Sequence, residues 1–126
     1  MATILVIDDD ASIRRSLRRI LELEGHEVLE AAEGSAGLRA VQLDPPDLVI
    51  TDIYMPEMDG IEFLIRLRDA HPELPIVAIS GGGFASKEFV LRDAELIGAT
   101  RTLSKPLLVG DVLGAVSAAL SGDPNP

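Results

Sequence analysis

The chain has 126 residues, contains no cysteine, and carries 11 basic against 21 acidic residues, for a formal net charge of -10. A chain of this length can bury the core of one domain, and the lack of cysteine excludes disulfides and thiolate metal sites. The acidic balance argues against nucleic acid as a partner, because phosphate backbones repel it. No apolar run reaches the length of a membrane span, so we expect a cytoplasmic protein with no membrane partner.

Short apolar runs alternate with helical patterns along the chain. Three runs are continuous, which is typical of strands covered on both faces: Ile4–Ile7, Leu48–Ile50 and Ile76–Ile79. The order of elements places weaker strands at 27–31 and 100–103. Helical patterns occupy residues 11–24, 34–43, 60–70, 86–97 and 108–120. The last of these keeps an apolar stripe at helical spacing: Val109, Val112, Leu113, Val116 and Leu120.

Five βα units predict an α/β fold with one five-stranded parallel sheet, right-handed crossovers and helices on both faces. We assign residues 1–121 to this single domain and residues 122–126 to a disordered polar tail, because the tail is rich in glycine and proline. Ligands of such folds sit beyond the carboxyl ends of the strands, so the residues that follow the strands are the candidates for function.

Polar residues follow four of the predicted strands. They are Asp8-Asp9-Asp10, Asp52, Ser80 and Lys105-Pro106. If these loops open on one rim, several carboxylates share a small volume with one ammonium group, which a hard divalent cation would relieve. An all-oxygen site beside a lysine suits phosphoryl transfer, with a carboxylate as the attacking group. Each piece also has an ordinary explanation, since aspartate is a favoured helix N-cap and serine a common turn residue.

These residues resemble the response-regulator receiver family of two-component signalling over nearly the whole chain, from Ile4 to about Leu120. The most specific marker is the run Asp52-Ile53-Tyr54-Met55-Pro56-Glu57-Met58-Asp59-Gly60. The acid pair Asp8-Asp9, Ser80, and Ser104-Lys105-Pro106 stand at matching positions. The resemblance implies a flavodoxin-like fold with strand order 2-1-3-4-5, which is also the order of the chemotaxis member of this family.

The resemblance also implies a role for each matching position. Asp52 would accept a phosphoryl group from a phosphohistidine on a sensor kinase or phosphotransfer protein. Asp8, Asp9, Asp52 and the carbonyl of Tyr54 would hold Mg²⁺, for which Mn²⁺ could substitute. Ser80 and Lys105 would contact the phosphoryl group, and a cis bond could shape the loop at Pro106. Such a protein catalyses only its own phosphorylation and dephosphorylation and is not an enzyme acting on external substrates.

Two features depart from the family pattern. Thr102 stands where the family often has an aromatic residue that couples to the Ser80 position, so an aromatic switch is in doubt. Gly81-Gly82-Gly83 makes the next loop permissive, and we expect this loop and the helix after it to carry the activation change. The family often signals or dimerises through helix 4, strand 5 and helix 5, so a downstream effector and a homodimer are both expected partners there.

The first helix carries four arginines, Arg14, Arg15, Arg18 and Arg19, which are expected to form either a solvated face or a docking surface for the phosphohistidine protein. Two functions other than phosphoryl acceptance in a receiver remain open. In a haloacid-dehalogenase-type phosphatase, Asp8 would be the nucleophile and Asp10 the acid or base, but the run from Asp52 to Gly60 would be unexplained. A receiver-like interaction module that is never phosphorylated is the second alternative.

Overall fold

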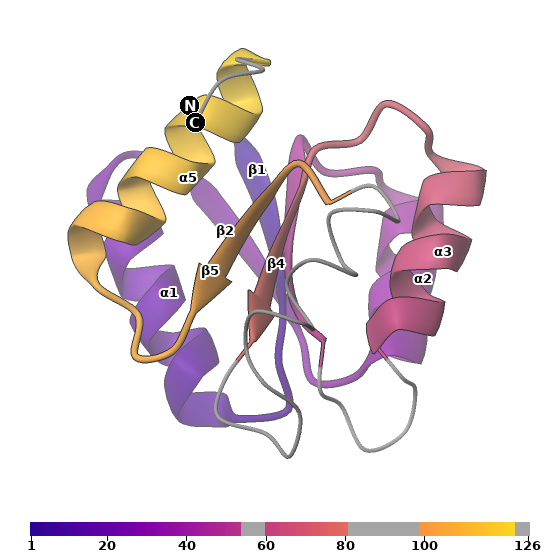
Figure 1. Ribbon diagram of the computed structural model, residues 1–126, viewed down its shortest axis with the longest axis horizontal. Helices are drawn as coiled ribbons and strands as arrows, with labels where there is room; N and C mark the ends of the chain where they lie inside the picture. Colours follow the sequence, from indigo (N-terminus) through magenta and orange to yellow (C-terminus); the bar gives the residue numbers. More distant parts are fainter. Residues whose placement is uncertain (54–59, 81–98, 123–126) are drawn as a thin grey trace.

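The structure, a computed structural model, describes residues 1–53, 60–80 and 99–122. Five strands and four helices form within these residues (Figure 1). The strands are β1 Thr3–Ile7, β2 Glu27–Ala31, β3 Leu48–Asp52, β4 Ile76–Ser80 and β5 Arg101–Ser104. The helices are α1 Ala11–Leu23, α2 Gly34–Leu43, α3 Gly60–Ala70 and α5 Val109–Ser121. The helix expected at 86–97 and the tail residues 123–126 lie outside the described residues.

The five strands form one parallel sheet in the order β2-β1-β3-β4-β5. The predicted α/β fold and its 2-1-3-4-5 order are therefore confirmed. The order reverses at β1, which lies between β2 and β3. Ile7 of β1 is paired with Thr51 of β3, so continuing this register by one residue sets Asp8 beside Asp52. All strands run in one direction, and their carboxyl ends meet at the lower edge of Figure 1.

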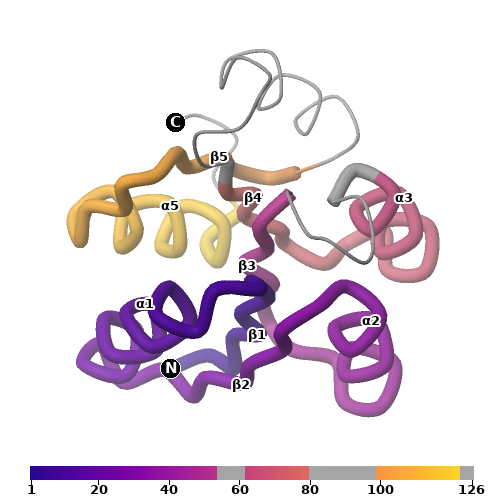
Figure 2. Tube along the Cα trace, turned by 90° about the horizontal axis from the view of Figure 1, so that it is seen from below, coloured from indigo at the N-terminus to yellow at the C-terminus, as the bar shows by residue number. Residues whose placement is uncertain are grey.

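Helices cover both faces of the sheet, with α1 and α5 on one face and α2 and α3 on the other (Figure 2). The side chains of β1 alternate between two cores. Ile4 and Val6 join the cluster under α1 and α5, whereas Leu5 and Ile7 join the cluster under α2 and α3. This double burial explains why the strand sequences are continuously apolar.

The helix boundaries follow local signals. Asp10 is the N-cap of α1, where its carboxylate accepts hydrogen bonds from the backbone N–H of Ser12 at 2.9 Å and from its hydroxyl at 2.7 Å. Gly122 ends α5 in the left-handed conformation, with φ 71°, which glycine adopts without steric cost. None of the described helices is both long and apolar enough to span a bilayer.

The first residue of the apolar stripe of α5 is not buried. Val109 is 55% exposed, and the buried residues of α5 are Val112, Val116 and Ala119. Val109 is the first residue of the helix and lies at the rim of the domain, next to the exposed Leu108. The apolar stripe of α5 therefore begins one turn later than its sequence pattern indicates.

Candidate functional site

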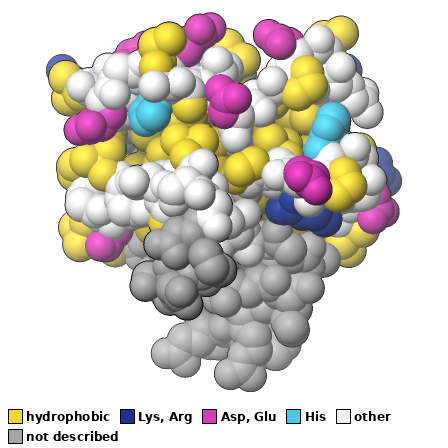
Figure 3. Space-filling model, turned by 90° about the horizontal axis from the view of Figure 1, so that it is seen from above, with side chains coloured by type: hydrophobic (Ala, Val, Ile, Leu, Met, Phe, Trp, Pro, Cys, Tyr) yellow, Lys and Arg dark blue, Asp and Glu magenta, His cyan; other side chains and the backbone are white. Residues whose placement is uncertain are grey.

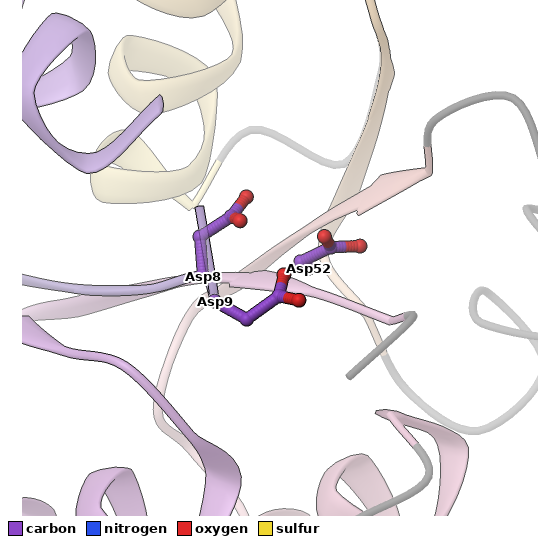
Figure 4. Close-up of side chains that lie close together, drawn as sticks. All are labelled: Asp8, Asp9 and Asp52. Carbon is purple, nitrogen blue, oxygen red and sulfur yellow. The ribbon is translucent and has the colours of Figure 1, made fainter. Parts of the chain in front are cut away.

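The sheet brings three aspartates together where the strand order reverses. Asp8 and Asp9 directly follow β1, and Asp52 is the last residue of the neighbouring β3. Their side chains project into the same space beyond the strand ends (Figure 4). One carboxylate oxygen from each lies within 4.8 Å of the others, close enough for all three to reach a single cation. Asp8 and Asp52 are buried, whereas Asp9 is exposed.

Lys105 completes this cluster from the end of β5. Its ammonium Nζ lies 3.2 Å from Asp52 Oδ2 and 3.3 Å from Asp8 Oδ2, so it bridges the two buried carboxylates. Burial alone would lower the pKa of Lys105, but the charges of Asp52 and Asp8 outweigh it and raise that pKa above its ordinary value. The peptide bond between Lys105 and Pro106 is cis, as the sequence resemblance had suggested.

The buried position of Asp8 disfavours the charged form of its carboxyl group. Burial of its carboxyl group raises its pKa from 3.8 to about 6, and the charge of Asp52 adds to this. The Asp10 N–H, which donates to Asp8 Oδ1 at 2.8 Å, and the Lys105 ammonium act in the opposite direction. The other oxygen, Oδ2, is buried and accepts no hydrogen bond from the described residues; its ion pair with Lys105 is its compensation. Among the described residues, this carboxylate therefore has one backbone donor and one ion pair, the Asp10 N–H and the Lys105 ammonium.

The remaining predicted site residues are described only in part. Ser80 ends β4 and is paired with Ser104, which directly precedes Lys105, so its backbone lies on the correct rim. Its side chain is outside the described residues, as are Tyr54 and the glycines at 81–83. The expectation that the loop at 81–83 and the helix after it change on activation therefore stays a prediction. Thr102 lies within β5 and is partly buried.

Asp10 does not belong to the acid cluster. Its carboxylate is exposed and engaged with Ser12, and this pair of hydrogen bonds lowers its pKa. A phosphatase of the haloacid-dehalogenase type would need Asp10 as the acid or base beside Asp8. An acid or base that already caps a helix with its pKa lowered is poorly suited to that task. The cap thus accounts for the third aspartate of the run.

The four arginines of α1 divide into two pairs. Arg14 and Arg18 are partly buried and form ion pairs with Glu30 of β2, at 3.2 Å and 2.5 Å between the nearest atoms. Arg15 and Arg19 are exposed. Sequence reasoning missed the role of Glu30. The available signal was topological: α1 runs back along β2, so its first turns lie beside the end of that strand.

Acidic side chains are distributed differently at the opposite end of the sheet, where the strands begin. Figure 3 looks onto the end at which the strands begin, and the acidic side chains visible there are spread among apolar and polar ones. The acids of the candidate site are gathered instead at the carboxyl ends. The fold and site together define a doubly wound α/β protein whose acidic cluster and lysine lie at the topological switch point.

Comparison with known sequences agrees with this class. Residues 4–117 match the family model of the response regulator receiver domain, so the chain belongs to the response-regulator receiver family. Curated relatives include the response regulators MprA of Mycolicibacterium vanbaalenii and Mycobacterium leprae, 37% and 36% identical over 117 residues. The alignments cover 93% of this chain but 49% and 50% of those relatives, so the chain spans about half their length.

Solved structures support the same assignment. The receiver domain of NtrX from Brucella abortus is 34% identical, with a TM-score of 0.88 over 94% of this chain and 98% of that domain. A response regulator receiver domain protein from Clostridium thermocellum is 31% identical, with a TM-score of 0.88 over 97% and 96% of the two chains. The predicted family and flavodoxin-like fold are confirmed, and the protein is a receiver domain of the two-component type.

Proposed function

We propose that this receiver accepts a phosphoryl group on Asp52 in a Mg²⁺-dependent reaction, with a phosphohistidine protein as donor. The observation that carries this proposal is the meeting of Asp8, Asp9, Asp52 and Lys105 at the carboxyl ends of β1, β3 and β5. A carboxylate at the centre of such a group is accessible to a charged donor only when the surrounding negative charge is neutralised.

The donor set fits a hard divalent cation. All three side chains offer carboxylate oxygens within 4.8 Å of one another, and Asp8 Oδ2 is a buried oxygen whose partner among the described residues is the Lys105 ammonium at 3.3 Å. Mg²⁺ prefers such oxygens and retains water or phosphate oxygens at its other positions. Asp8, Asp9 and Asp52 would hold it, with Mn²⁺ as a substitute and the carbonyl of Tyr54 as a further ligand.

The proposed transfer is a displacement at phosphorus. An oxygen of Asp52 attacks the phosphorus, a P–O bond forms as the P–N bond to the donor imidazole breaks, and the departing nitrogen keeps the electron pair. Lys105, which already contacts Asp52, stabilises negative charge on the phosphoryl oxygens, and the Ser80 hydroxyl donates to one of them. Bound Mg²⁺ supplies further neutralisation of that charge. Attack of water on the acyl phosphate reverses the modification.

The test is labelling with a small phosphoryl donor, such as phosphoramidate, in the presence of MgCl₂. Intact-mass spectrometry should show one added phosphoryl group on the wild type, and peptide mapping should place it at Asp52. Asp52→Asn should prevent the label, as should removal of Mg²⁺ by a chelator. The matched control is Asp10→Asn, which retains an N-cap side chain on α1 and should label normally.

The outcomes separate the three candidate functions. Label mapped to Asp8 would support the phosphatase, and a wild type that takes no label with any small donor would support an interaction module that is never phosphorylated. Label at Asp52 that persists equally without divalent metal would contradict the metal-dependent part of the proposal. The family match favours neither alternative over the proposal, and labelling decides between a phosphorylated receiver and an interaction module of the same fold.

Partners follow from the same proposal. The exposed Arg15 and Arg19 of α1 would meet an acidic surface of the sensor kinase or phosphotransfer protein in the cytoplasm. A groove between β5 and α5 would contribute to the effector or dimer surface, together with the helix expected at 86–97. Small residues leave this groove open along α5, namely Gly110, Gly114 and Ala118.

A further inference from the structure

An ion-pair network ties α1 to β2 beside the acid cluster. Glu30 accepts from Arg14 Nε at 3.2 Å and from Arg18 Nε at 2.5 Å. The two arginines lie one turn apart on the same face of α1, and both are partly buried. Their difference lies in the second contact. Arg18 Nη1 donates to Glu22 Oε2 of its own helix at 3.2 Å, whereas Arg14 Nη1 donates to a backbone oxygen of the acid cluster.

The second contact of Arg14 is with the backbone of Asp8. Its Nη1 donates to the Asp8 carbonyl oxygen at 2.6 Å, and the Arg14 side chain is only 18% exposed. A guanidinium group is planar and rigid, so two bonds in different directions fix its orientation. Through its bonds to the Asp8 carbonyl and to Glu30, Arg14 thus links the turn between β1 and α1 to the end of β2.

The Asp8 carbonyl belongs to the peptide unit that joins Asp8 to Asp9. On the Asp8 side, the residue is also held by its N–H, which donates to the Ala31 carbonyl at 3.2 Å, and by its carboxylate, which accepts from the Asp10 N–H. Asp9 has no such support, because its carboxylate makes no hydrogen bond or ion pair with any part of the chain that the structure describes. The backbone that precedes Asp9, including the peptide plane that Arg14 contacts, sets the position from which its side chain extends.

We propose that Arg14 is a positioning residue of the metal site, which holds the Asp8–Asp9 peptide so that the exposed Asp9 carboxylate points toward Asp52. This inference rests on the proposed function, since it assumes that Asp9 is a metal ligand. It also separates Arg14 from the exposed arginines of α1: its guanidinium group serves the fold of the acid pair rather than a docking partner. Outer partners that orient metal ligands commonly control affinity in this way.

Arg18 provides the matched control. It has the same charge, the same helix and the same partner Glu30 as Arg14, but it does not contact Asp8. A loss of positive charge or of the α1–β2 ion pair would affect both variants alike. An effect through the Asp8 carbonyl would appear only when Arg14 is changed.

The experiment is a titration of the full chain with MgCl₂, in which the backbone amide chemical shifts measured by NMR report binding. Arg14→Ala should weaken Mg²⁺ binding by about tenfold, the lower end of the range for such outer partners. Arg18→Ala should bind Mg²⁺ as the wild type does. The Mg²⁺ affinity of Arg14→Lys should lie between those of the two alanine variants, because one ammonium group cannot make both hydrogen bonds of the guanidinium group in the same geometry. Urea unfolding of each variant establishes that it is folded under the titration conditions.

A double-mutant cycle distinguishes positioning from a general structural role. If Arg14 acts through Asp9, then Arg14→Ala should add little to the loss caused by Asp9→Asn, whereas independent effects would be additive. Equal effects of Arg14→Ala and Arg18→Ala, or an additive cycle, would overturn the inference while leaving the receiver function intact. Failure of the wild type to bind Mg²⁺ would instead overturn the proposed function. If Arg14→Ala does not fold, Arg14→Lys against Arg18→Lys decides the same question.

Discussion

Asp8 shows how a single buried acid links the site to stability. Its pKa is about 6 in the folded chain, mainly because of burial, against an ordinary value of 3.8. The folded protein therefore holds this proton at pH values where the unfolded chain has released it. As the pH rises from about 4 to about 6, the contribution of Asp8 to folding stability falls, and it stays low above that window.

Removal of this charge should stabilise the metal-free protein. In buffer with a chelator at about pH 7.5, we expect Asp8→Asn to raise the free energy of unfolding by on the order of 2 kcal/mol. At about pH 4, where Asp8 is protonated in the folded state, the variant and the wild type should differ little. Urea unfolding at both pH values measures the effect. Asp69→Asn changes an exposed acid of α3 and is the control for the loss of one negative charge; a similar response of both variants would refute the assignment to Asp8.

Elements of this fold differ in how well their sequences predict them. The strands β1, β3 and β4 could be recognised because burial on both faces demands continuous apolar runs. The helices α2 and α3 have the predicted bounds, since breakers flank them. The strand β5 begins at Arg101, one residue later than expected, because an edge strand of mixed composition carries a weak signal.

The sequence was enough to predict which residues lie at the carboxyl ends of the strands. It was not enough to predict the contacts of their side chains. Sequence position placed Asp8, Asp9, Asp52 and Lys105 at strand ends, and parallel topology brought them together. The hydrogen bond from Arg14 to the Asp8 carbonyl depends on the rotation of α1 about its axis relative to the sheet. Periodicity reveals which face of a helix is apolar, but it does not tell which backbone oxygen a flanking arginine reaches.

The packing of α2 against β1 offers a sharp test at the scale of elements. A Cβ atom at Gly37 would lie 2.4 Å from Ile7 Cδ1, 3.1 Å from Ile7 Cγ1 and 3.6 Å from Phe63 Cε1. Ile7 and Phe63 are both buried, so the core has little room to yield. We expect Gly37→Ala to destabilise the fold by about 1–3 kcal/mol in urea unfolding, despite the better helix propensity of alanine.

Gly114 supplies the matched control for this substitution. It also lies within a helix, α5, but a Cβ there would meet nothing within 4 Å. Gly114→Ala should therefore stabilise the protein by up to about 1 kcal/mol through helix propensity alone. Adding Ile7→Val to Gly37→Ala removes Cδ1, the nearest atom, and should recover part of the loss. Equal responses at the two glycines would show that helix propensity decides and that the contact with Ile7 does not.

At the scale of the whole molecule, the net charge of -10 makes the folded state sensitive to cations. General screening by salt acts on all exposed charges, whereas a bound divalent cation acts at the acid cluster. The two effects differ in their dependence on concentration and on Asp52. A cation that binds only the folded chain stabilises it according to its concentration relative to Kd.

Magnesium should therefore raise the stability of the whole domain through this one site. At a concentration about ten times its Kd, Mg²⁺ should add about 1.4 kcal/mol to the free energy of unfolding at neutral pH. NaCl at equal ionic strength should give a smaller effect, since monovalent ions do not replace a carboxylate-bound divalent cation. Asp52→Asn should lose most of the Mg²⁺ response, because it removes one of the three carboxylates that would hold the cation. It should keep the NaCl response, because screening acts on all exposed charges. Urea unfolding with MgCl₂, with NaCl and with chelator separates these terms, and an undiminished Mg²⁺ response in Asp52→Asn would place the binding elsewhere on this acidic surface.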